Sequence, residues 1–346
     1  MSNLNFNKNK KSNFIAISVG DPAGIGIEIT LKSLNRLKDD TDIKPILVGC
    51  KKCILGIHSD LKKKGIKDMV NPKDIKIIDI PFKGVLIQGK PNSYTGEASY
   101  QWLTHATNLV IKGNAKSLVT APIAKHAWHQ AGHFYAGQTE RLAELCKAKE
   151  VSMMFTALSP NNGWRLNTLL ATTHIPLAEV TKKLEPQIIL SKLDALLAFC
   201  KQFKEEPKLA IAGINPHSGE KGHLGNEETQ WLIPTIKKWK NANPNIQLDG
   251  PIPPDTCWIP AANAWNESKQ SYVHDGFLAL YHDQGLIPLK LIAFDSAVNT
   301  TLGLPFARTS PDHGTGFDIA GKGVARPTSM TEAIKTASDL SRQENL

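Results

Sequence analysis

The sequence predicts an α/β protein with a largely parallel sheet, and two observations lead to this fold class. Short apolar, β-branched runs recur along the chain, and longer amphipathic stretches with helical spacing lie between them. This alternation is typical of parallel strands joined by crossover helices. The predicted strands are 14–19, 44–49, 117–121, 168–173, 209–214 and 276–281, and the clearest predicted helices are 97–112, 139–148, 177–203 and 226–242.

Length and composition indicate a globular protein of about two domains. The chain has 346 residues, of which 41% are hydrophobic and 21% are charged. Its apolar runs are shorter than a bilayer requires, so we expect no membrane partner. Residues 1–13 are polar and basic and lack the apolar core of a signal peptide. We therefore expect a disordered tail on a cytoplasmic protein.

The charge and the cysteines exclude two further classes. Lysine and arginine number 41 against 32 aspartate and glutamate, and much of the excess lies in the lysine-rich region 51–83. That region contains no nucleic-acid motif and almost no aromatic residues, so we interpret it as a solvated basic face and predict no nucleic-acid partner. The five cysteines are an odd number and are scattered, which argues against a disulfide framework.

Histidines follow three of the predicted strands at or near the point where each strand ends. They are His174, His217 and His282. Each one alone is more often a hydrogen-bonded structural residue, but parallel strands end at the same edge of a sheet, so the three could meet at one point. Imidazoles suit Zn²⁺ and other divalent transition metals, and three protein ligands leave a position open for substrate. Asp283 could bind such a metal or orient one of its ligands.

Two glycine-rich segments are candidates for binding phosphate or a cofactor. The first, "GDPAGIGIE" at 20–28, joins a strand to a helix but matches neither standard nucleotide fingerprint. An anion-binding turn and a purely structural turn both stay open there. The second segment, 299–323, contains Arg308, and Lys290 lies just upstream. Both cations suit a phosphate or a carboxylate.

The second segment also carries the candidate cofactor residues His313, Gly314 and Asp318. A carboxylate such as that of Asp318 is a suitable acceptor for ribose hydroxyl groups. It would disfavour a 2′-phosphate, which favours NAD over NADP.

Longer motifs connect these observations to a known family. They are "SVGDPAGIGIEI", "LVTAPIAKHAW", "LLATTHIPL", "AGINPHSGEKGHLGNEE", "GPIPPDT", "YHDQGLIPLK" and "NTTLGLPFARTSPDHGT". From about residue 14 to about residue 330 the chain resembles the 4-hydroxythreonine-4-phosphate dehydrogenase family, commonly called PdxA. "HGTGFDIAGKGVARPT" is also similar to the cofactor loop of isopropylmalate dehydrogenases.

The resemblance implies two α/β/α domains with a cleft between them, an isopropylmalate-dehydrogenase-like fold. We expect residues 14–137 plus 295–346 to form the first domain, on the cofactor side. Residues 138–294 would form the second domain, which would carry the metal and the dimer interface.

The resemblance further implies NAD-dependent oxidation of 4-phosphohydroxy-L-threonine at its 3-hydroxyl group. The resulting β-keto acid would lose CO₂ to give 3-amino-2-oxopropyl phosphate, on the way to pyridoxal 5′-phosphate. One divalent metal per site (Zn, Mg or Co) would be bound by His174, His217 and His282, with His282 coming from the second subunit of a homodimer.

The resemblance also assigns roles to other side chains. Carboxylates matching Asp255 and Asp283 lie close to the metal in the family, and both are candidate proton acceptors. The residues that match the family's substrate ligands are Gln138, Thr139, Lys290, Asn299 and Arg308.

Gln138 is the main departure from the family, which usually has a histidine at this position. An amide forms hydrogen bonds but does not titrate, so the difference bears on rate or on substrate. An alternative substrate is therefore a four-carbon sugar-acid phosphate such as threonate or erythronate 4-phosphate. A third possibility, a non-catalytic protein that binds metal and phosphate, conflicts with the intact set of three histidines and two cations.

Overall fold

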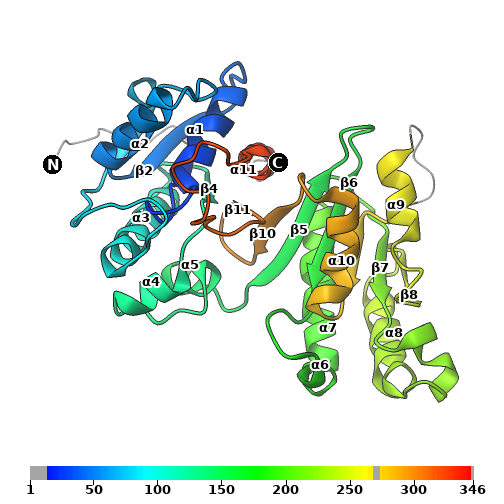
Figure 1. Ribbon diagram of the computed structural model, residues 1–346. Coiled ribbons are helices and arrows are strands. Elements are labelled where there is room, and N and C mark those ends of the chain that lie inside the picture. The colour runs from blue at the N-terminus through cyan, green and yellow to red at the C-terminus, as the bar shows by residue number, and fades with distance from the viewer. Residues whose placement is uncertain (1–13, 268–272, 344–346) are drawn as a thin grey trace. The chain divides into compact units, whose positions relative to one another are not determined.

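A computed structural model describes residues 14–267 and 273–343 and confirms the α/β class (Figure 1). The chain forms two compact units: unit 1 comprises residues 1–151 and 303–346, and unit 2 comprises residues 152–302. The sequence analysis instead placed the two crossings near residues 138 and 295. The predicted tail, 1–13, lies outside the described residues, so the disorder and the cytoplasmic location inferred from it stay predictions.

The strands of unit 1 pair in parallel in the order β3-β2-β1-β4-β11. They are β1 (Phe14–Ser18), β2 (Lys44–Gly49), β3 (Lys76–Asp79), β4 (Ser117–Thr120) and β11 (Ala307–Pro311). The helices of this unit are α1 (Gly26–Arg36), α2 (Lys51–Lys63), η1 (Pro72–Asp74), α3 (Ser93–Ile111), α4 (Lys125–Gln130), α5 (Gln138–Cys146) and α11 (Thr328–Gln343).

Two neighbouring residues of β11 show how the layers of unit 1 are arranged. Thr309 Oγ1 donates to the main-chain oxygen of Ala333 in α11, at 2.7 Å. Arg308 donates to Thr120 Oγ1 and Gln138 Oε1. Successive side chains of a strand point to opposite faces, so α11 and the start of α5 lie on opposite sides of the sheet. The guanidinium of Arg308 therefore lies on the same side of the sheet as the start of α5.

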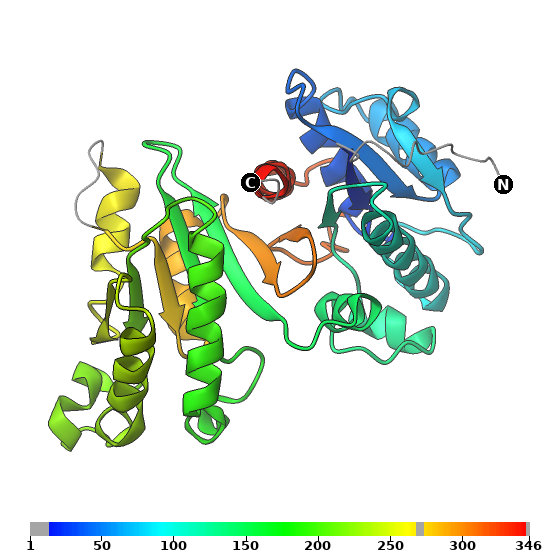
Figure 2. The same ribbon diagram turned by 180° about the vertical axis from the view of Figure 1, so that it is seen from behind.

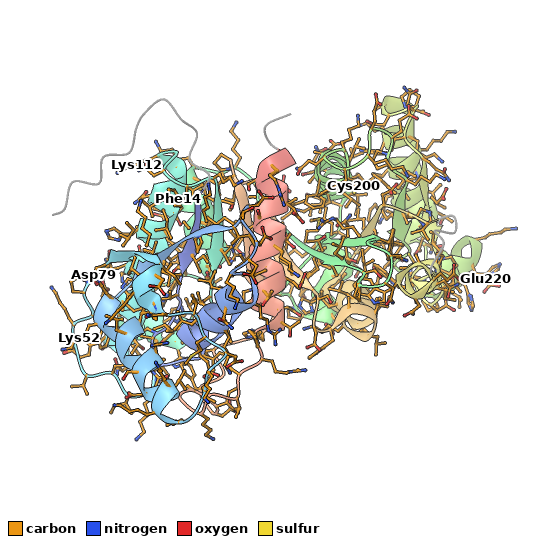
Figure 3. The ribbon with its side chains drawn as sticks, turned by 90° about the horizontal axis from the view of Figure 1, so that it is seen from above. Phe14, Lys52, Asp79, Lys112, Cys200 and Glu220 are labelled. Carbon is orange, nitrogen blue, oxygen red and sulfur yellow. The ribbon has the colours of Figure 1, made fainter. Side chains whose placement is uncertain are left out.

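Cys50 and Cys53, the two cysteines closest to each other in the sequence, lie at the start of α2. Cys50 is the N-cap residue, and its Sγ accepts from Cys53 N at 3.4 Å. Asp79, at the end of β3, accepts from Lys51 N at 2.8 Å, which places a carboxylate at the positive end of the helix. Asp79 and the neighbouring Lys52 are labelled in Figure 3. All five cysteines are free.

The strands of unit 2 pair in the order β10-β5-β6-β9-β7-β8, and β5 is antiparallel to both of its neighbours. They are β5 (Ser152–Leu158), β6 (Arg165–Leu170), β7 (Leu209–Ala212), β8 (Leu248–Ile252), β9 (Gly276–Ala279) and β10 (Val298–Leu302). The helices of this unit are α6 (Leu177–Lys183), α7 (Pro186–Cys200), η2 (Pro216–Gly222), η3 (Glu228–Leu232), α8 (Ile233–Ala242), α9 (Ile259–Asn266) and α10 (His282–Ala293).

Helices cover both faces of the sheet in unit 2. On one face, α9 and α10 bury apolar side chains against the strands, and the ring centroids of Trp258 and Phe277 lie 5.1 Å apart. On the other face, α7 packs closely on β9, since a Cβ on Gly276 would lie 2.8 Å from Cys200 Sγ. Figures 1 and 2, viewed from opposite sides, show α10 in front of this sheet in one view and α7 in front of it in the other.

One sequence-based expectation for unit 2 is wrong. The predicted helix 177–203 is two helices, because Pro186 has no N–H for a continuing helix and instead starts α7. His282 is the first residue of α10, which begins directly after the predicted strand 276–281. Within the described residues, every helix is too short or too polar to cross a membrane.

Candidate active site

His174 and His282 lie together at one edge of the sheet in unit 2. Their strands, β6 and β9, are parallel neighbours. The pairing continues beyond the strands, because Thr172 donates to the main-chain oxygen of Leu280 through its N–H at 3.2 Å and through Oγ1 at 2.8 Å. The two imidazole rings that follow have centroids 5.5 Å apart. The structure thus brings together two of the three histidines that the strand-end pattern singled out.

The carboxylate of Asp283 orients one of these two rings. His282 Nδ1 and Asp283 Oδ1 are 2.7 Å apart. A carboxylate only accepts, so Nδ1–H is the donor, and in a neutral ring the lone pair then lies on Nε2. Histidines that bind metals commonly use their second nitrogen in this way. His282 and Asp283 therefore form a carboxylate–histidine pair suited to metal binding.

Gln284 is a buried residue at this edge that the sequence analysis missed. Its Oε1 accepts from Leu280 N at 2.7 Å, and its Nε2 donates to the main-chain oxygen of Gly213 at 2.7 Å. Gln284 thus ties the end of β9 to the end of β7, the strand that leads to His217. The sequence offered one signal for Gln284, which is its polar side chain two positions after a strand-end histidine.

His217 begins an unusual turn in the same unit. His217 and Ser218 have positive φ values of 50° and 52°, which is uncommon for residues other than glycine. The base of the turn is fixed by buried Glu228, whose Oε1 accepts from Asn215 N at 2.7 Å. Glu220, labelled in Figure 3, belongs to the same turn. Strained backbone conformations of this kind cluster at functional sites, which makes this turn a candidate.

No three His, Cys, Asp or Glu side chains are grouped closely enough to hold a metal ion within the part of the chain that the structure describes. His174 and His282 therefore form a pair in one chain, and His217 stands outside that pair. Asp255, the other predicted catalytic carboxylate, is exposed in the turn that follows β8.

A buried cation forms a second candidate site, in unit 1. Arg308 is 3% exposed, and burial lowers its pKa to about 10, so the guanidinium stays protonated at neutral pH. Its Nη2 donates to Thr120 Oγ1 at 2.6 Å and to Gln138 Oε1 at 3.4 Å. Gln138 in turn donates to the main-chain oxygen of Ala121 at 3.1 Å. Neutral groups thus orient a buried positive charge, which the carboxylate of Glu140 also attracts. A buried, oriented guanidinium is suited to binding an anion.

The remaining predicted substrate ligands lie in both units. Thr139 follows Gln138 in α5 of unit 1 and is half-buried. Lys290 of α10 and Asn299 of β10 belong to unit 2, and both are half-buried. Lys290 Nζ lies 5.9 Å from the ring centroid of Phe294.

The candidate cofactor segment follows β11 in unit 1. His313 Nδ1 donates to the main-chain oxygen of Gly314 at 2.9 Å, while its Nε2 is buried without a hydrogen-bond partner among the described residues. A Cβ on Gly314 would meet no atom within 4 Å, so there is open space beside this backbone. Asp318 is exposed. The segment therefore offers a buried acceptor nitrogen, an uncrowded glycine and an exposed carboxylate.

The turn "GDPAGIG" supports this segment. A Cβ on Gly24 would lie 2.7 Å from Thr315 O, and Ile25 N donates to the same oxygen at 2.9 Å. The close approach of the two backbones explains the glycine. A purely structural role, in which the turn supports the segment after β11, therefore explains these contacts.

Asp21, within that turn, is a second polar residue that the sequence analysis missed. It is 0% exposed, accepts from Ala23 N at 2.9 Å and from Thr95 Oγ1 at 3.2 Å, and links the end of β1 to the start of α3. Burial raises its pKa to about 6, although its hydrogen bonds and His126 act in the opposite direction. The signal was again a polar residue near the end of a strand.

Replacing Asp21 by asparagine is expected to stabilise the protein at pH 7 and to have little effect at pH 4. Because the pKa is raised in the folded state, the folded protein binds more protons than the unfolded chain between about pH 4 and pH 6. The wild type therefore loses stability as pH rises through that window, by up to about 3 kcal/mol. Asparagine carries no charge and avoids this loss.

Chemical denaturation at the two pH values would measure the difference. Asp39→Asn, the same change at an exposed position, is the control and should alter neither value. An Asp21→Asn variant that is less stable than wild type at both pH values would contradict the prediction.

Comparisons with known proteins identify the family of the chain. The family model "Pyridoxal phosphate biosynthetic protein PdxA" matches residues 40–337. A 4-hydroxythreonine-4-phosphate dehydrogenase from Synechococcus sp. (strain RCC307) is 52% identical over 327 residues, covering 94% of this chain and 99% of the relative. One from Aquifex aeolicus (strain VF5) is 38% identical over 339 residues, covering 96% and 98%.

Solved structures give the same result. The crystal structure of 4-hydroxythreonine-4-phosphate dehydrogenase from Klebsiella pneumoniae has a TM-score of 0.79 and 33% identity, and covers 96% of this chain and 99% of that chain. With the matched family model and the near-full-length relatives, these results show that the chain belongs to the 4-hydroxythreonine-4-phosphate dehydrogenase (PdxA) family of pyridoxal phosphate biosynthesis.

Proposed function

We propose that this chain oxidises 4-phosphohydroxy-L-threonine with NAD⁺, using a divalent metal, as a homodimer. The observation that carries the proposal is the pairing of His174 and His282, whose ring centroids are 5.5 Å apart, with Asp283 orienting His282. Family membership supplies the reaction, and this pair supports its dependence on a metal. The oxidised product is a β-keto acid, which loses CO₂ to give 3-amino-2-oxopropyl phosphate.

The donor set fits Zn or Co better than Mg, because imidazole suits transition-metal ions whereas Mg prefers oxygen ligands. Asp283 leaves Nε2 of His282 available to bind such an ion. In the proposal His217 is the third ligand. When bound, the metal would lower the pKa of the substrate hydroxyl group and NAD⁺ would accept the hydride.

The chain's own residues would position the substrate. We assign the phosphate to Arg308 and Lys290, because a buried, oriented guanidinium and a half-buried ammonium suit a doubly charged anion. Gln138, Thr139 and Asn299 would complete the contacts by hydrogen bonds. Asp255 and Asp283 remain the candidate proton acceptors.

The segment after β11 fits a nicotinamide cofactor. His313 Nε2 is a buried acceptor, Gly314 leaves space for a ligand to approach the backbone, and Asp318 could accept from ribose hydroxyl groups. A carboxylate at that place would repel a 2′-phosphate, so NAD is proposed rather than NADP.

The exposed face of α10 supports a homodimer. Ile287, Leu291 and Phe294 are 59%, 83% and 59% exposed, and their spacing puts them on one side of the helix. Clustered exposed apolar side chains are typical of interfaces. The same helix begins with His282 and Asp283. A second copy of this chain that covers this face would lie beside the proposed metal ligands, and the site could draw residues from both subunits.

NAD⁺ reduction measured with two substrates tests the proposal. We expect turnover with 4-phosphohydroxy-L-threonine and much less with threonate or erythronate 4-phosphate. The variant Gln138→His restores the usual family residue. If Gln138 only forms hydrogen bonds with Arg308 and the substrate, this variant should keep the preference for 4-phosphohydroxy-L-threonine. Turnover with a sugar-acid phosphate alone would overturn the proposed substrate and would favour the alternative that Gln138 suggests.

A further inference from the structure

A buried ion pair in α1 holds the end of the candidate cofactor segment. Lys32 and Glu28 are 4% and 2% exposed, and Lys32 Nζ lies 2.8 Å from Glu28 Oε1. Lys32 Nζ also donates to the main-chain oxygens of Gly323, at 2.8 Å, and Ala325, at 3.1 Å. An ammonium group has three N–H donors, so these three acceptors use all of them.

Glu28 completes the connection from its own side. Its Oε1 also accepts from Ala325 N at 2.9 Å, so both main-chain polar groups of Ala325 are bound by side chains of α1. Its Oε2 is buried and has no hydrogen-bond partner among the described residues. Lys32 is therefore the cation that balances the buried charge of Glu28.

A packing contact alone would not need these charges. Burying two ions carries a desolvation cost, and apolar side chains of similar size often stabilise a core equally well. The charged pair adds directional hydrogen bonds to the main chain of Gly323 and Ala325, and these bonds fix the path of the main chain. The pair is thus suited to setting a backbone conformation rather than to supplying stability.

The same region of α1 fixes the segment at its other end. Ile25 N, just before α1, donates to Thr315 O at 2.9 Å. The stretch that contains Asp318 therefore lies between one anchor at Thr315 and a second at Gly323 and Ala325. Glycines at 316, 321 and 323 have positive φ values of 54°, 74° and 76°, which allow the sharp turns of this stretch.

We propose that Lys32 and Glu28 are positioning residues for cofactor binding, which hold the main chain around Asp318 in the conformation that receives the ribose of the cofactor. The inference rests on the proposed assignment of NAD to the segment after β11. It goes further in placing a determinant of cofactor affinity within the core, on a helix that the cofactor would not touch.

The test compares a neutral pair with an exposed lysine that makes a similar contact. Glu28→Met/Lys32→Met replaces both ions by unbranched apolar side chains, so no buried charge is left unbalanced. Lys64→Met is the matched control, because exposed Lys64 Nζ donates to the main-chain oxygen of Gly321 at 2.6 Å and water can replace it. NAD⁺ affinity is measured by calorimetry, and amide hydrogen exchange is followed over 316–325.

We expect the double variant to bind NAD⁺ about tenfold more weakly, as the loss of a charge-assisted hydrogen bond implies. Exchange at residues 323–325 should become faster, while kcat at saturating NAD⁺ should stay near wild type. Lys64→Met should change neither NAD⁺ affinity nor exchange at 323–325. If the double variant does not fold, Glu28→Gln/Lys32→Met takes its place, since it keeps an acceptor for Ala325 N and should weaken binding by a smaller factor.

The outcomes separate this inference from the proposed function. A wild-type protein that does not bind NAD⁺ would overturn the cofactor assignment itself. Tight binding by the wild type, with equal affinity and equal exchange in the neutral-pair variants, would overturn only the role of Lys32 and Glu28.

Discussion

Arg308→Met is expected to lower kcat/KM by roughly two to three orders of magnitude, because the phosphate of the substrate would lose a buried charged partner. Arg308 is 3% exposed and keeps its proton at neutral pH, since burial lowers its pKa only to about 10. Methionine fills similar space but offers no donor. Steady-state kinetics with varied substrate would show the loss mainly as a raised KM if Arg308 binds the ground state.

Two further variants test whether the loss of kcat/KM is specific to the guanidinium of Arg308. Arg308→Lys keeps the charge without the planar fork that Thr120 and Gln138 hold, so its kcat/KM should be intermediate. Arg36→Met removes an exposed arginine that bonds Thr328 and should leave kcat/KM unchanged. Unaltered kcat/KM in a folded Arg308→Met protein would remove Arg308 from the proposed phosphate site.

His282→Ala is expected to abolish turnover and to lower the metal content of the purified protein, because two imidazoles bind a divalent ion far more weakly than three. Metal analysis by mass spectrometry and NAD⁺ reduction would be measured on the same samples. The exposed His105, in α3, provides the control, and His105→Ala should retain both metal and activity. Retained metal-dependent turnover in His282→Ala would contradict the proposed ligand set.

Mixing inactive variants then tests whether the site is shared between subunits. If His282 comes from the partner of the chain that supplies His174, a dimer of one His174→Ala and one His282→Ala chain has one intact site. An equal mixture that exchanges freely should recover about a quarter of wild-type activity, since half of the dimers are mixed and each has one working site of two.

The opposite result is expected if the site uses His174 and His282 of the same chain, whose rings are paired in the structure. If both rings of one chain serve the same ion, every site in the mixed dimer carries one of the two changes. That mixture would stay inactive, and the expectation from the family resemblance that His282 serves the partner's site would be wrong. Recovery in mixtures of His217→Ala with either of the other two variants would then show that the partner supplies His217.

The strand-end histidines show how much of the site could be predicted from sequence. Apolar, β-branched runs indicated where β6 and β9 lie, and the histidines after them were therefore expected at one edge of a sheet. This worked because β6 and β9 turned out to be direct neighbours. Strand order is decided by packing across the sheet, which a single sequence does not reveal. β7 is also a direct neighbour of β9, yet His217 lies in the turn beyond β7 and outside the pair of histidines, so the order of the strands alone does not decide which side chains meet.

Other features depended on partners far away along the chain. Strands β3, β5, β8, β10 and β11 were missed, and "VNTTL" in β10 carries little of the apolar alternation that marks a strand. β10 is a strand because it pairs with β5. Asp21 and Gln284 were overlooked as well, since their importance comes from burial, and burial is a property of the folded chain.

The sequence by itself determined the α/β class, the family, and the residue types available for a metal, a phosphate and a cofactor. Only the tertiary structure decided which of them meet: His174 with His282, Arg308 with Gln138, and Lys32 with the main chain of Gly323 and Ala325. The physical reason is that local patterns record how a segment folds onto the core. Contacts between segments nearly 300 residues apart, such as Lys32 and Ala325, depend on the packing of the whole unit.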